Sequence, residues 1–340
     1  MQKLLQRARK VFTPKKNTFV NLAWQSDSRL IGLEASAPKS AKDKPAVAFF
    51  SVDVLTGRRT TSPNRLPFLA IDFVGGTELV FSPESAALLG ITDDDTGFVV
   101  HILSTDGQRH HTWELEKPLL SISERLHHAS PPFWSDHGRA WVVLAFRHKG
   151  EEPTSELFAV TGRRDEPGKF RIVSLGRSDK SEIGCFHPDA FQGQYGFVNF
   201  NLGAILECTD GDTVLGARGT LQIGYRPQLF RYTFRLSEGA RSRTATIIPF
   251  PTVGSFNQLA YSPVSKRLAV FVAQDYRKDT SLLQQGYELH TLRLDGSQRV
   301  ALGELAFPYT GPFPRQLQWL PGGRKLCFEF KGAFYVVDGV

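Results

Sequence analysis

An aromatic residue, a short polar turn and an apolar stretch recur six times along this chain of 340 residues. Four mostly turn-forming residues follow each aromatic residue, and a basic residue then begins the apolar stretch in four of the copies. Turn residues between two apolar stretches predict a hairpin of two β-strands in every copy. The six aromatic residues are Trp24, Phe73, Trp134, Phe191, Tyr261 and Trp319, spaced 49, 61, 57, 70 and 58 residues apart.

A glycine marks a second turn in every repeat. Glycine tolerates the positive φ of a tight hairpin turn, so a third and a fourth strand are expected on its two sides. Arginine stands two places after four of these glycines, at Arg59, Arg109, Arg164 and Arg241. Each repeat is therefore expected to form four strands. The glycines that end the extended stretches are Gly57, Gly107, Gly162, Gly239, Gly296 and Gly339.

Four-stranded units that repeat along a chain are typical of a β-propeller, in which the sheets stand around a central axis. A single four-stranded sheet would expose an apolar face and two open edges, and radial packing buries the faces. We therefore predict an all-β fold with one domain over residues 1–340. The expected architecture is a six-bladed β-propeller of four-stranded antiparallel blades.

The last repeat lacks a fourth strand, and the first residues of the chain offer one. Residues 9–16 align with residues 58–65, and their prolines coincide. We predict that residues 9–13 pair with residues 333–338 as the outermost strand of the last blade, closing the ring. In that strand Val11 would face away from its two neighbours, because side chains alternate along a strand.

An amphipathic basic helix is the alternative for the first twelve residues. It would contact an anionic membrane or act as a targeting segment. Residues 1–7 are left open between a basic arm, a helix and a targeting segment.

Trp134-Ser135-Asp136-His137-Gly138-Arg139 resembles the PD40 repeat of TolB-like six-bladed propellers, which are WD40-like in architecture. The run from Trp319 to Arg324 matches it as well, and Tyr261-Ser262-Pro263 matches in part. The resemblance covers nearly the whole chain and implies a propeller fold. It implies no activity, because propellers host unrelated functions. TolB itself is not expected, since that protein is exported and the first residues here show no export signal.

Charge and cysteine usage narrow the function classes. The net charge is +7, and residues 1–65 alone carry 13 Lys/Arg and 4 Asp/Glu, so the basic character lies in one sector. This distribution argues against specific nucleic-acid binding. Three distant cysteines predict neither a disulfide framework nor a zinc site, which fits the cytoplasm. No apolar run approaches the ~20 residues of a membrane span.

Long connections between the second and third strands provide the predicted contact surface, because loops on rigid scaffolds carry function. The largest, at about residues 200–226, lies in the fourth repeat and has apolar alternation of its own, which favours an extra hairpin. We take Arg218 and Arg226 in this insertion as candidate binding residues. The connections are residues 35–46, 84–96, 147–155, 200–226 and 273–286.

Two polar clusters are further candidates for binding. His127 and His128 precede the first strand of the third repeat, in a loop near the predicted channel mouth. Adjacent histidines on a strand would point to opposite faces, so a shared metal ion is not expected. Asp93, Asp94 and Asp95 offer carboxylates for a hard cation or for acid–base chemistry, and a solvated turn is the simpler interpretation.

These observations favour a non-enzymatic scaffold that binds a protein partner and needs no cofactor or metal. A small-molecule ligand and a membrane contact through the basic N-terminal residues remain open. The alternative is a propeller enzyme, a lactonase, lyase or hydrolase, with its site at the channel mouth. Acids or histidines that converge in the channel would favour the enzyme.

Overall fold

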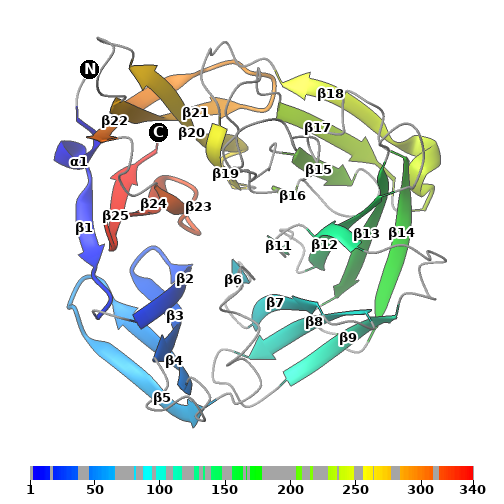
Figure 1. Ribbon diagram of the computed structural model, residues 1–340, viewed down its shortest axis with the longest axis horizontal. Helices are drawn as coiled ribbons and strands as arrows, with labels where there is room; N and C mark the ends of the chain where they lie inside the picture. The colour runs from blue at the N-terminus through cyan, green and yellow to red at the C-terminus, as the bar shows by residue number, and fades with distance from the viewer. Residues whose placement is uncertain are drawn as a thin grey trace.

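The computed structural model describes most of the predicted strands and few of the connections between them (Figure 1). No helix among these residues is long and apolar enough to cross a membrane. The described residues are 3–15, 18–36, 46–65, 80–81, 87–93, 97–104, 110–116, 126–129, 133–134, 139–147, 155–163, 166, 169–177, 204–208, 215–216, 229–235, 237–248, 256–262, 264–276, 284–308 and 314–339.

Strands form nearly all of the regular structure, in six separate sheets. Sheet 1 orders β2 (Thr18–Ser26), β3 (Arg29–Ser36), β4 (Ala46–Asp53) and β5 (Arg59–Arg65) as an antiparallel meander. Sheet 2 does the same with β6 (Val80–Phe81), β7 (Ala87–Asp93), β8 (Gly97–Ser104) and β9 (His110–Glu116). Sheet 3 contains β10 (Leu126–Ala129), β11 (Phe133–Trp134), β12 (Arg139–Arg147), β13 (Ser155–Arg163) and β14 (Phe170–Arg177).

The remaining three sheets follow in chain order. Sheet 4 contains β16 (Leu215–Gly216), β15 (Ala204–Cys208), β17 (Leu229–Phe234) and β18 (Thr244–Ile248), with the 3₁₀ helix η4 (Gly239–Ser242) before β18. Sheet 5 orders β19 (Phe256–Ser262), β20 (Arg267–Tyr276), β21 (Gln284–Arg293) and β22 (Val300–Pro308). Sheet 6 orders β23 (Arg315–Trp319), β24 (Lys325–Phe330), β25 (Ala333–Asp338) and β1 (Arg9–Phe12).

One strand of each sheet lies toward the centre of the molecule (Figure 1). These inner strands touch in succession: β2 contacts β6, β6 contacts β11, β11 contacts β16, β16 contacts β19, and β19 contacts β23. Hydrogen bonds join β23 to β2, because Gln318 Nε2 donates to the carbonyl of Leu22 at 3.2 Å and the amide of Leu22 donates to Gln316 Oε1 at 3.2 Å. The sheets therefore stand around a common centre.

Two sheets depart from the predicted antiparallel meander. In sheet 4, β15 and β17 run parallel, with Ala204 opposite Phe230. In sheet 3 the first strand is split into β10 and β11, which both pair with β12. The prediction of four antiparallel strands per repeat was therefore wrong for sheet 4, where the long insertion supplies two of the strands.

The predicted repeat was also misaligned with the observed strands at two positions. The first strand of sheet 2 ends at Phe81, which Ser82 and Pro83 follow, rather than at Phe73. Part of the predicted loop 84–96 is consequently strand β7. Gly162 lies inside β13 rather than in a turn, and a side chain there would overlap the indole ring of Trp113 from sheet 2. This glycine is explained by close packing between two sheets.

The N-terminal residues form the predicted strand, preceded by a helix much shorter than the twelve-residue alternative. Residues Leu4–Arg7 form the short helix α1, and β1 pairs antiparallel with β25, with Arg9 opposite Val336 and Phe12 opposite Phe334. The predicted pairing of the two ends of the chain is confirmed. The predicted alternation was wrong, because a β-bulge between Lys10 and Phe12 brings both Val11 and Phe12 against the same buried cluster.

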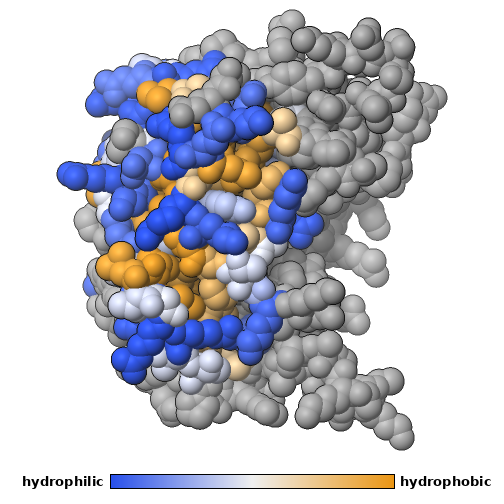
Figure 2. Space-filling view, turned by 90° about the vertical axis from the view of Figure 1, so that its left-hand side faces the viewer, coloured by the Kyte–Doolittle hydropathy of each residue, from blue (hydrophilic) through white to orange (hydrophobic). Residues whose placement is uncertain are grey.

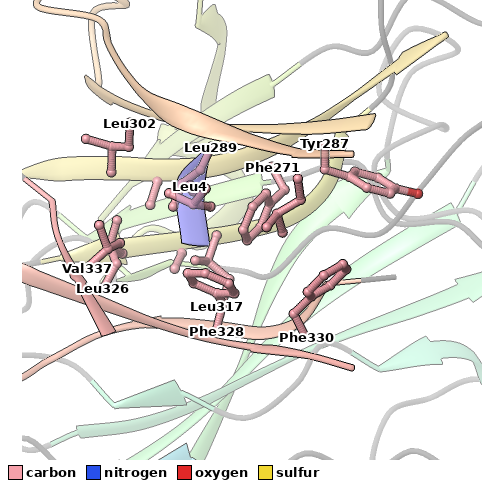
Figure 3. Close-up of a cluster of buried hydrophobic side chains, with 13 residues drawn as sticks. Leu4, Phe271, Tyr287, Leu289, Leu302, Leu317, Leu326, Phe328, Phe330 and Val337 are labelled. Carbon is pink, nitrogen blue, oxygen red and sulfur yellow. The ribbon is translucent and has the colours of Figure 1, made fainter. Parts of the chain in front are cut away.

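Sheets 5 and 6 bury a large apolar cluster between them (Figure 3). The side chain of Leu4 projects from α1 into this cluster and is fully buried. Phe271 from sheet 5 meets Phe328 from sheet 6 edge to face, with ring centroids 5.4 Å apart. Trp319 packs against the cluster and donates from Nε1 to the carbonyl of Ala260, at 3.2 Å. The helix that begins the chain thus adds a side chain to an interface between two sheets.

A second cluster lies between sheets 6 and 1. It contains Trp24, Phe50 and Phe334, and Val11 and Phe12 of β1 pack against it. Trp24 is buried here, whereas Trp319 of the last repeat is only partly buried. Cys327 is fully enclosed in this cluster, and burial raises the pKa of its thiol to about 12.

Candidate interaction surface

The residues predicted to form a site are only partly described. Asp93 is the last residue of β7 and lies opposite Phe98 of β8. Asp94, Asp95, Arg218 and Arg226 lie outside the described residues. No group of three potential metal ligands exists in the part of the chain that the structure describes.

His127 and His128 lie in a strand rather than in the predicted loop. Both belong to β10, which pairs with β12 with His128 opposite Ala145. A bulge falls between Leu126 and His128, so strict alternation does not apply at His127. The loop prediction failed because the first strand of sheet 3 extends in a second piece upstream of Phe133.

The predicted loop surface lies largely outside the described residues. Of the insertion at 200–226, the structure describes β15 and β16, which pair antiparallel with Leu206 opposite Leu215. The insertion therefore forms an antiparallel strand pair, but this pair supplies two of the four strands of sheet 4 rather than the extra hairpin that was expected. The best-described surface is at the opposite end of sheets 1, 5 and 6.

We call this surface the turn end. It consists of five turns: residues 27–28 and 54–58 of sheet 1, 264–266 and 294–299 of sheet 5, and 320–324 of sheet 6. In an antiparallel meander the first and third turns lie at the same end, because successive strands reverse direction. Hydrogen bonds and close contacts join these turns to one another, both within a sheet and between sheets.

Two contacts connect the three sheets across the turn end. The amide of Gly322 in sheet 6 donates to Asp27 Oδ1 in sheet 1, at 2.8 Å. A Cβ at Gly322 would lie 2.6 Å from Asp27 Oδ2, so a larger residue would displace this carboxylate. Gly323 packs against Val264 of sheet 5, where an added Cβ would lie 3.0 Å from the valine Cβ. The turns therefore form one continuous surface.

The turns within each sheet are also held together. In sheet 1 the amide of Val54 donates to the carbonyl of Ser28 at 2.9 Å. In sheet 5 the buried Arg267 donates from Nη2 to the carbonyl of Gln298 at 2.8 Å and to Thr291 Oγ1 at 3.2 Å. Thr291 Oγ1 in turn donates to the carbonyl of Gly339, at 3.0 Å. Arg267 thus ties two turns of sheet 5 together, and Thr291 joins them to the C-terminal residues.

Aspartates cap the turns and stay ionised. Asp53 Oδ1 accepts from the amides of Leu55 at 2.9 Å and Thr56 at 3.0 Å, and the Thr56 and Leu55 bonds lower the pKa of Asp53. Hydrogen bonds from Ser297 lower the pKa of Asp295 in the same way, with the amide 2.9 Å from Oδ1. Local hydrogen bonds of this kind fix the conformation of a turn. Side chains at the turn end are therefore presented on ordered backbone.

Exposed aliphatic side chains gather at this end. Leu55 is 73% exposed and Val264 is 64% exposed, each on a turn of the turn end. Val300, which is 43% exposed, directly follows the turn 294–299. Leu5, which is 37% exposed, lies on α1, and α1 packs on β22, where Arg7 donates a hydrogen bond to the carbonyl of Leu302. Among the residues whose side-chain exposure the structure describes, these four are the exposed large hydrophobic ones.

Basic side chains surround these aliphatic residues. Figure 2 views the side of the molecule with α1 and β1, where hydrophobic patches lie among hydrophilic residues. The turn end and its rim carry four carboxylates, Asp27, Asp53, Asp295 and Asp338, of which the first three accept backbone amides. Eight basic residues outnumber them: Arg7, Arg9, Arg29, Arg58, Lys266, Arg293, Arg324 and Lys325.

A buried ionisable cluster lies within sheet 5, where Arg299 of the turn 294–299 reaches it. Glu288 and His290 lie on the face of sheet 5 that carries Val270, Val272 and Leu292, because each pairs with a valine across β20 and β21. Glu288 Oε2 lies 2.8 Å from His290 Nε2, and both side chains are buried. Arg299 Nε donates to His290 Nδ1 at 3.2 Å.

This cluster is suited to packing rather than to proton transfer with solvent. Burial lowers the pKa of His290, and the carboxylate of Glu288 opposes that effect only in part. The imidazole is therefore neutral near pH 7, with its Nε2 hydrogen donated to Glu288. Sequence reasoning missed the pair, although the spacing Glu-x-His on a strand places both side chains on one face.

The turn end had a signal in the sequence. The repeat places a basic residue directly after the first turn, as at Arg29, Lys266 and Arg324, and another after the glycine turn, as at Arg58. Because both turns of a meander lie at one end, this recurrence predicts a basic end. The loops at the other end were favoured instead, because they are longer.

No protein-family model matches the sequence, and no characterised protein is similar to it in sequence. Solved structures with a similar arrangement include the gluconolactonase XC5397 from Xanthomonas campestris, with a TM-score of 0.46 and 10% identity over 99% of this chain and 93% of that one. The WD40 domain of SCAP from fission yeast has a TM-score of 0.33 and 9% identity over 97% of each chain. TolB from Acinetobacter baumannii has a TM-score of 0.38 and 11% identity over 89% of this chain and 63% of that one. Likeness of this degree assigns neither an activity nor a partner.

Proposed function

We propose that the chain is a closed six-bladed β-propeller that acts as a non-enzymatic scaffold for a protein partner. The observation that carries this proposal is the pairing of β1 with β25, which completes the last sheet with a strand from the other end of the chain. Without β1, the backbone groups of β25 would form an open edge. The pairing therefore favours a ring whose first and last blades are tied together.

Contacts between sheets 6 and 1 support closure independently of β1. Gln316 and Gln318 of β23 exchange hydrogen bonds with the backbone of Leu22 in β2. The amide of Gly322 is bonded to Asp27 across the same boundary. Polar bonds near the axis, together with the apolar cluster around Trp24 and Phe334, resist opening of the ring at this point.

The scaffold interpretation rests on polar side chains of the described residues that form hydrogen bonds within the fold. Arg267, Glu288 and His290 are buried and bonded within sheet 5. Turn residues such as Asp53 and Asp295 accept hydrogen bonds from backbone amides. These groups stabilise fixed surfaces, which is what a binding module requires. No observation on the described residues favours the enzyme alternative.

The partner is proposed to be a protein that binds the longer loops, including the insertion near β15 and β16. Long loops on a rigid ring offer a large and adaptable contact area. The TolB-like repeat and a cytoplasmic location belong to the same proposal.

The test is isolation of the full chain, tagged at its C-terminus, from its own cells at native abundance. Chemical crosslinking and size-exclusion chromatography should show a protein that co-elutes at a fixed ratio. Phe12→Ala, which loosens the boundary between sheets 6 and 1, should reduce the amount of that protein, whereas Leu5→Ala should not. The proposal is overturned if no protein co-elutes, or if the purified chain turns over lactone or glycoside substrates.

A further inference from the structure

The turn end combines two features that its role in the fold does not require. Leu55 and Val264 are exposed at the tips of turns, with 73% and 64% of their surface accessible. Basic residues outnumber acidic ones around them, and the caps on Asp53 and Asp295 hold the turns in place. Exposed apolar side chains grouped on one surface mark a contact with another molecule.

From these features we propose that the turn end docks on an anionic lipid bilayer. In this arrangement Leu55 and Val264 enter the boundary between headgroups and acyl chains, and Val300 and Leu5 add apolar contact at the rim. The surrounding Arg and Lys side chains lie at the level of the phosphate and carboxylate headgroups. This contact concerns the end opposite to the long loops, so it is independent of the scaffold proposed above.

The geometry of the apolar side chains favours a bilayer over a protein. Leu55 and Val264 lie at the tips of turns on sheets 1 and 5, and the bond between Gly322 and Asp27 and the contact between Gly323 and Val264 join these turns through sheet 6. Protein interfaces rely on Trp, Tyr and Arg that fill pockets. The exposed large hydrophobic residues here are two leucines and two valines, which suit insertion between acyl chains.

The charge of the turn end favours an anionic bilayer over a neutral one. Of its four carboxylates, Asp27, Asp53 and Asp295 are engaged with backbone amides, and eight basic residues surround them. Each Lys or Arg near an anionic surface strengthens binding by about fivefold. Nucleic acid is a weaker candidate, because single-stranded binding uses aromatic platforms for the bases and none is exposed among these turns in the described residues.

Vesicle co-sedimentation of the full chain tests this proposal. Binding should be strong to phosphatidylcholine vesicles that contain about a third phosphatidylserine, weak to pure phosphatidylcholine, and reduced by salt. Removing the apolar tips without changing charge, with Leu55→Ser and Val264→Ser together, should weaken binding at least about tenfold. Unchanged binding by this double variant would overturn the proposal.

Two charge reversals on sheet 6 form a matched pair. Arg324 lies at the turn end, whereas Lys331 lies in the turn between β24 and β25 at the opposite end, and both are exposed. Arg324→Glu should weaken binding to phosphatidylserine vesicles by at least about fivefold, and Lys331→Glu should bind as the original protein does. Equal loss in the two variants would mean that net charge alone drives binding and would overturn the assigned surface.

A label at the turn end reports insertion directly. In a chain with Cys185→Ser and Cys208→Ser, an environment-sensitive fluorophore on Leu55→Cys should shift to the blue on anionic vesicles, and one on Lys331→Cys should not. Near-ultraviolet circular dichroism checks that each variant is folded. Failure to bind vesicles, with saturable binding of an acidic protein or a nucleic acid to the turn end instead, would overturn the proposal.

Discussion

The ring of Phe12 stacks on the ring of Phe50, with centroids 5.6 Å apart and planes inclined by 26°. Phe12 belongs to β1 and therefore to sheet 6, whereas Phe50 belongs to β4 in sheet 1. Phe12 also contacts Phe334 of its own sheet, with centroids 6.1 Å apart. The guanidinium of Arg59 lies over the other ring of the stack, 4.3 Å from the Phe50 centroid. One side chain near the start of the chain thus packs at the boundary between the last sheet and the first.

Leu4 and Leu5 allow a matched test of the N-terminal segment. Leu4 is fully buried between sheets 5 and 6, and Leu5 is exposed on the same short helix. Leu4→Ala should lower the free energy of unfolding by about 2–5 kcal/mol, because it leaves a cavity in a packed core. Leu5→Ala should change it by less than about 1 kcal/mol. Urea titration measures both, and equal midpoints would mean that α1 does not dock in solution.

The thiol of Cys327 should report the boundary between sheets 6 and 1. Burial raises its pKa to about 12, so almost no thiolate exists at pH 8 and no reagent can reach it. In a chain with Cys185→Ser and Cys208→Ser, a thiol reagent should modify Cys327 only in denaturant. Phe12→Ala should speed the reaction under native conditions. Rapid modification of the Cys327 thiol under native conditions, in the chain that keeps Phe12, would contradict the packing around Cys327.

His290 should make stability fall in mild acid. Burial holds its pKa below the ordinary value of 6.5, so the unfolded chain binds a proton near pH 6.5 while the folded chain does not. Stability is therefore fully present above pH 6.5 and is lost as pH falls from there to the folded pKa, where the loss levels off. Urea midpoints measured from pH 7.5 to 5 should fall more steeply for the unaltered chain than for His290→Gln. Parallel curves would show that His290 titrates normally.

Trp24 and Trp319 should contribute to stability by different amounts. Trp24 is buried between sheets 6 and 1, so Trp24→Ala should cost about 3–5 kcal/mol. Trp319→Phe keeps most of the ring but removes the bond to the carbonyl of Ala260, and should cost about 0.5–1.5 kcal/mol. Denaturant unfolding tests both, and a smaller loss for Trp24→Ala than for Trp319→Phe would be inconsistent with their burial.

Sequence reasoning was most accurate where the repeat was regular. It predicted the strand boundaries near Trp24, Tyr261 and Trp319, and the positive φ of Gly57 and Gly296, observed at 72° and 81°. It failed in the second repeat, where Phe73 was chosen although Phe81-Ser82-Pro83 is nearer to the repeat phrase. Of the predicted site residues, the structure describes the strand positions of His127 and His128 in β10 and of Asp93 in β7, which belong to different sheets.

The sequence by itself determined the local units, because alternation and turn residues act over a few neighbouring residues. It also indicated the pairing of the two chain ends, because the last repeat lacks a fourth strand and residues 9–16 align with residues 58–65. Only the tertiary structure decided that β15 runs parallel to β17, that Cys327 is enclosed beside Phe334, and that Leu55 and Val264 stay exposed at one end. These features depend on which faces meet, and the partners are far apart along the chain. Asp27 and Gly322 are separated by 295 residues, so no local pattern could reveal that the turns of sheets 1 and 6 touch.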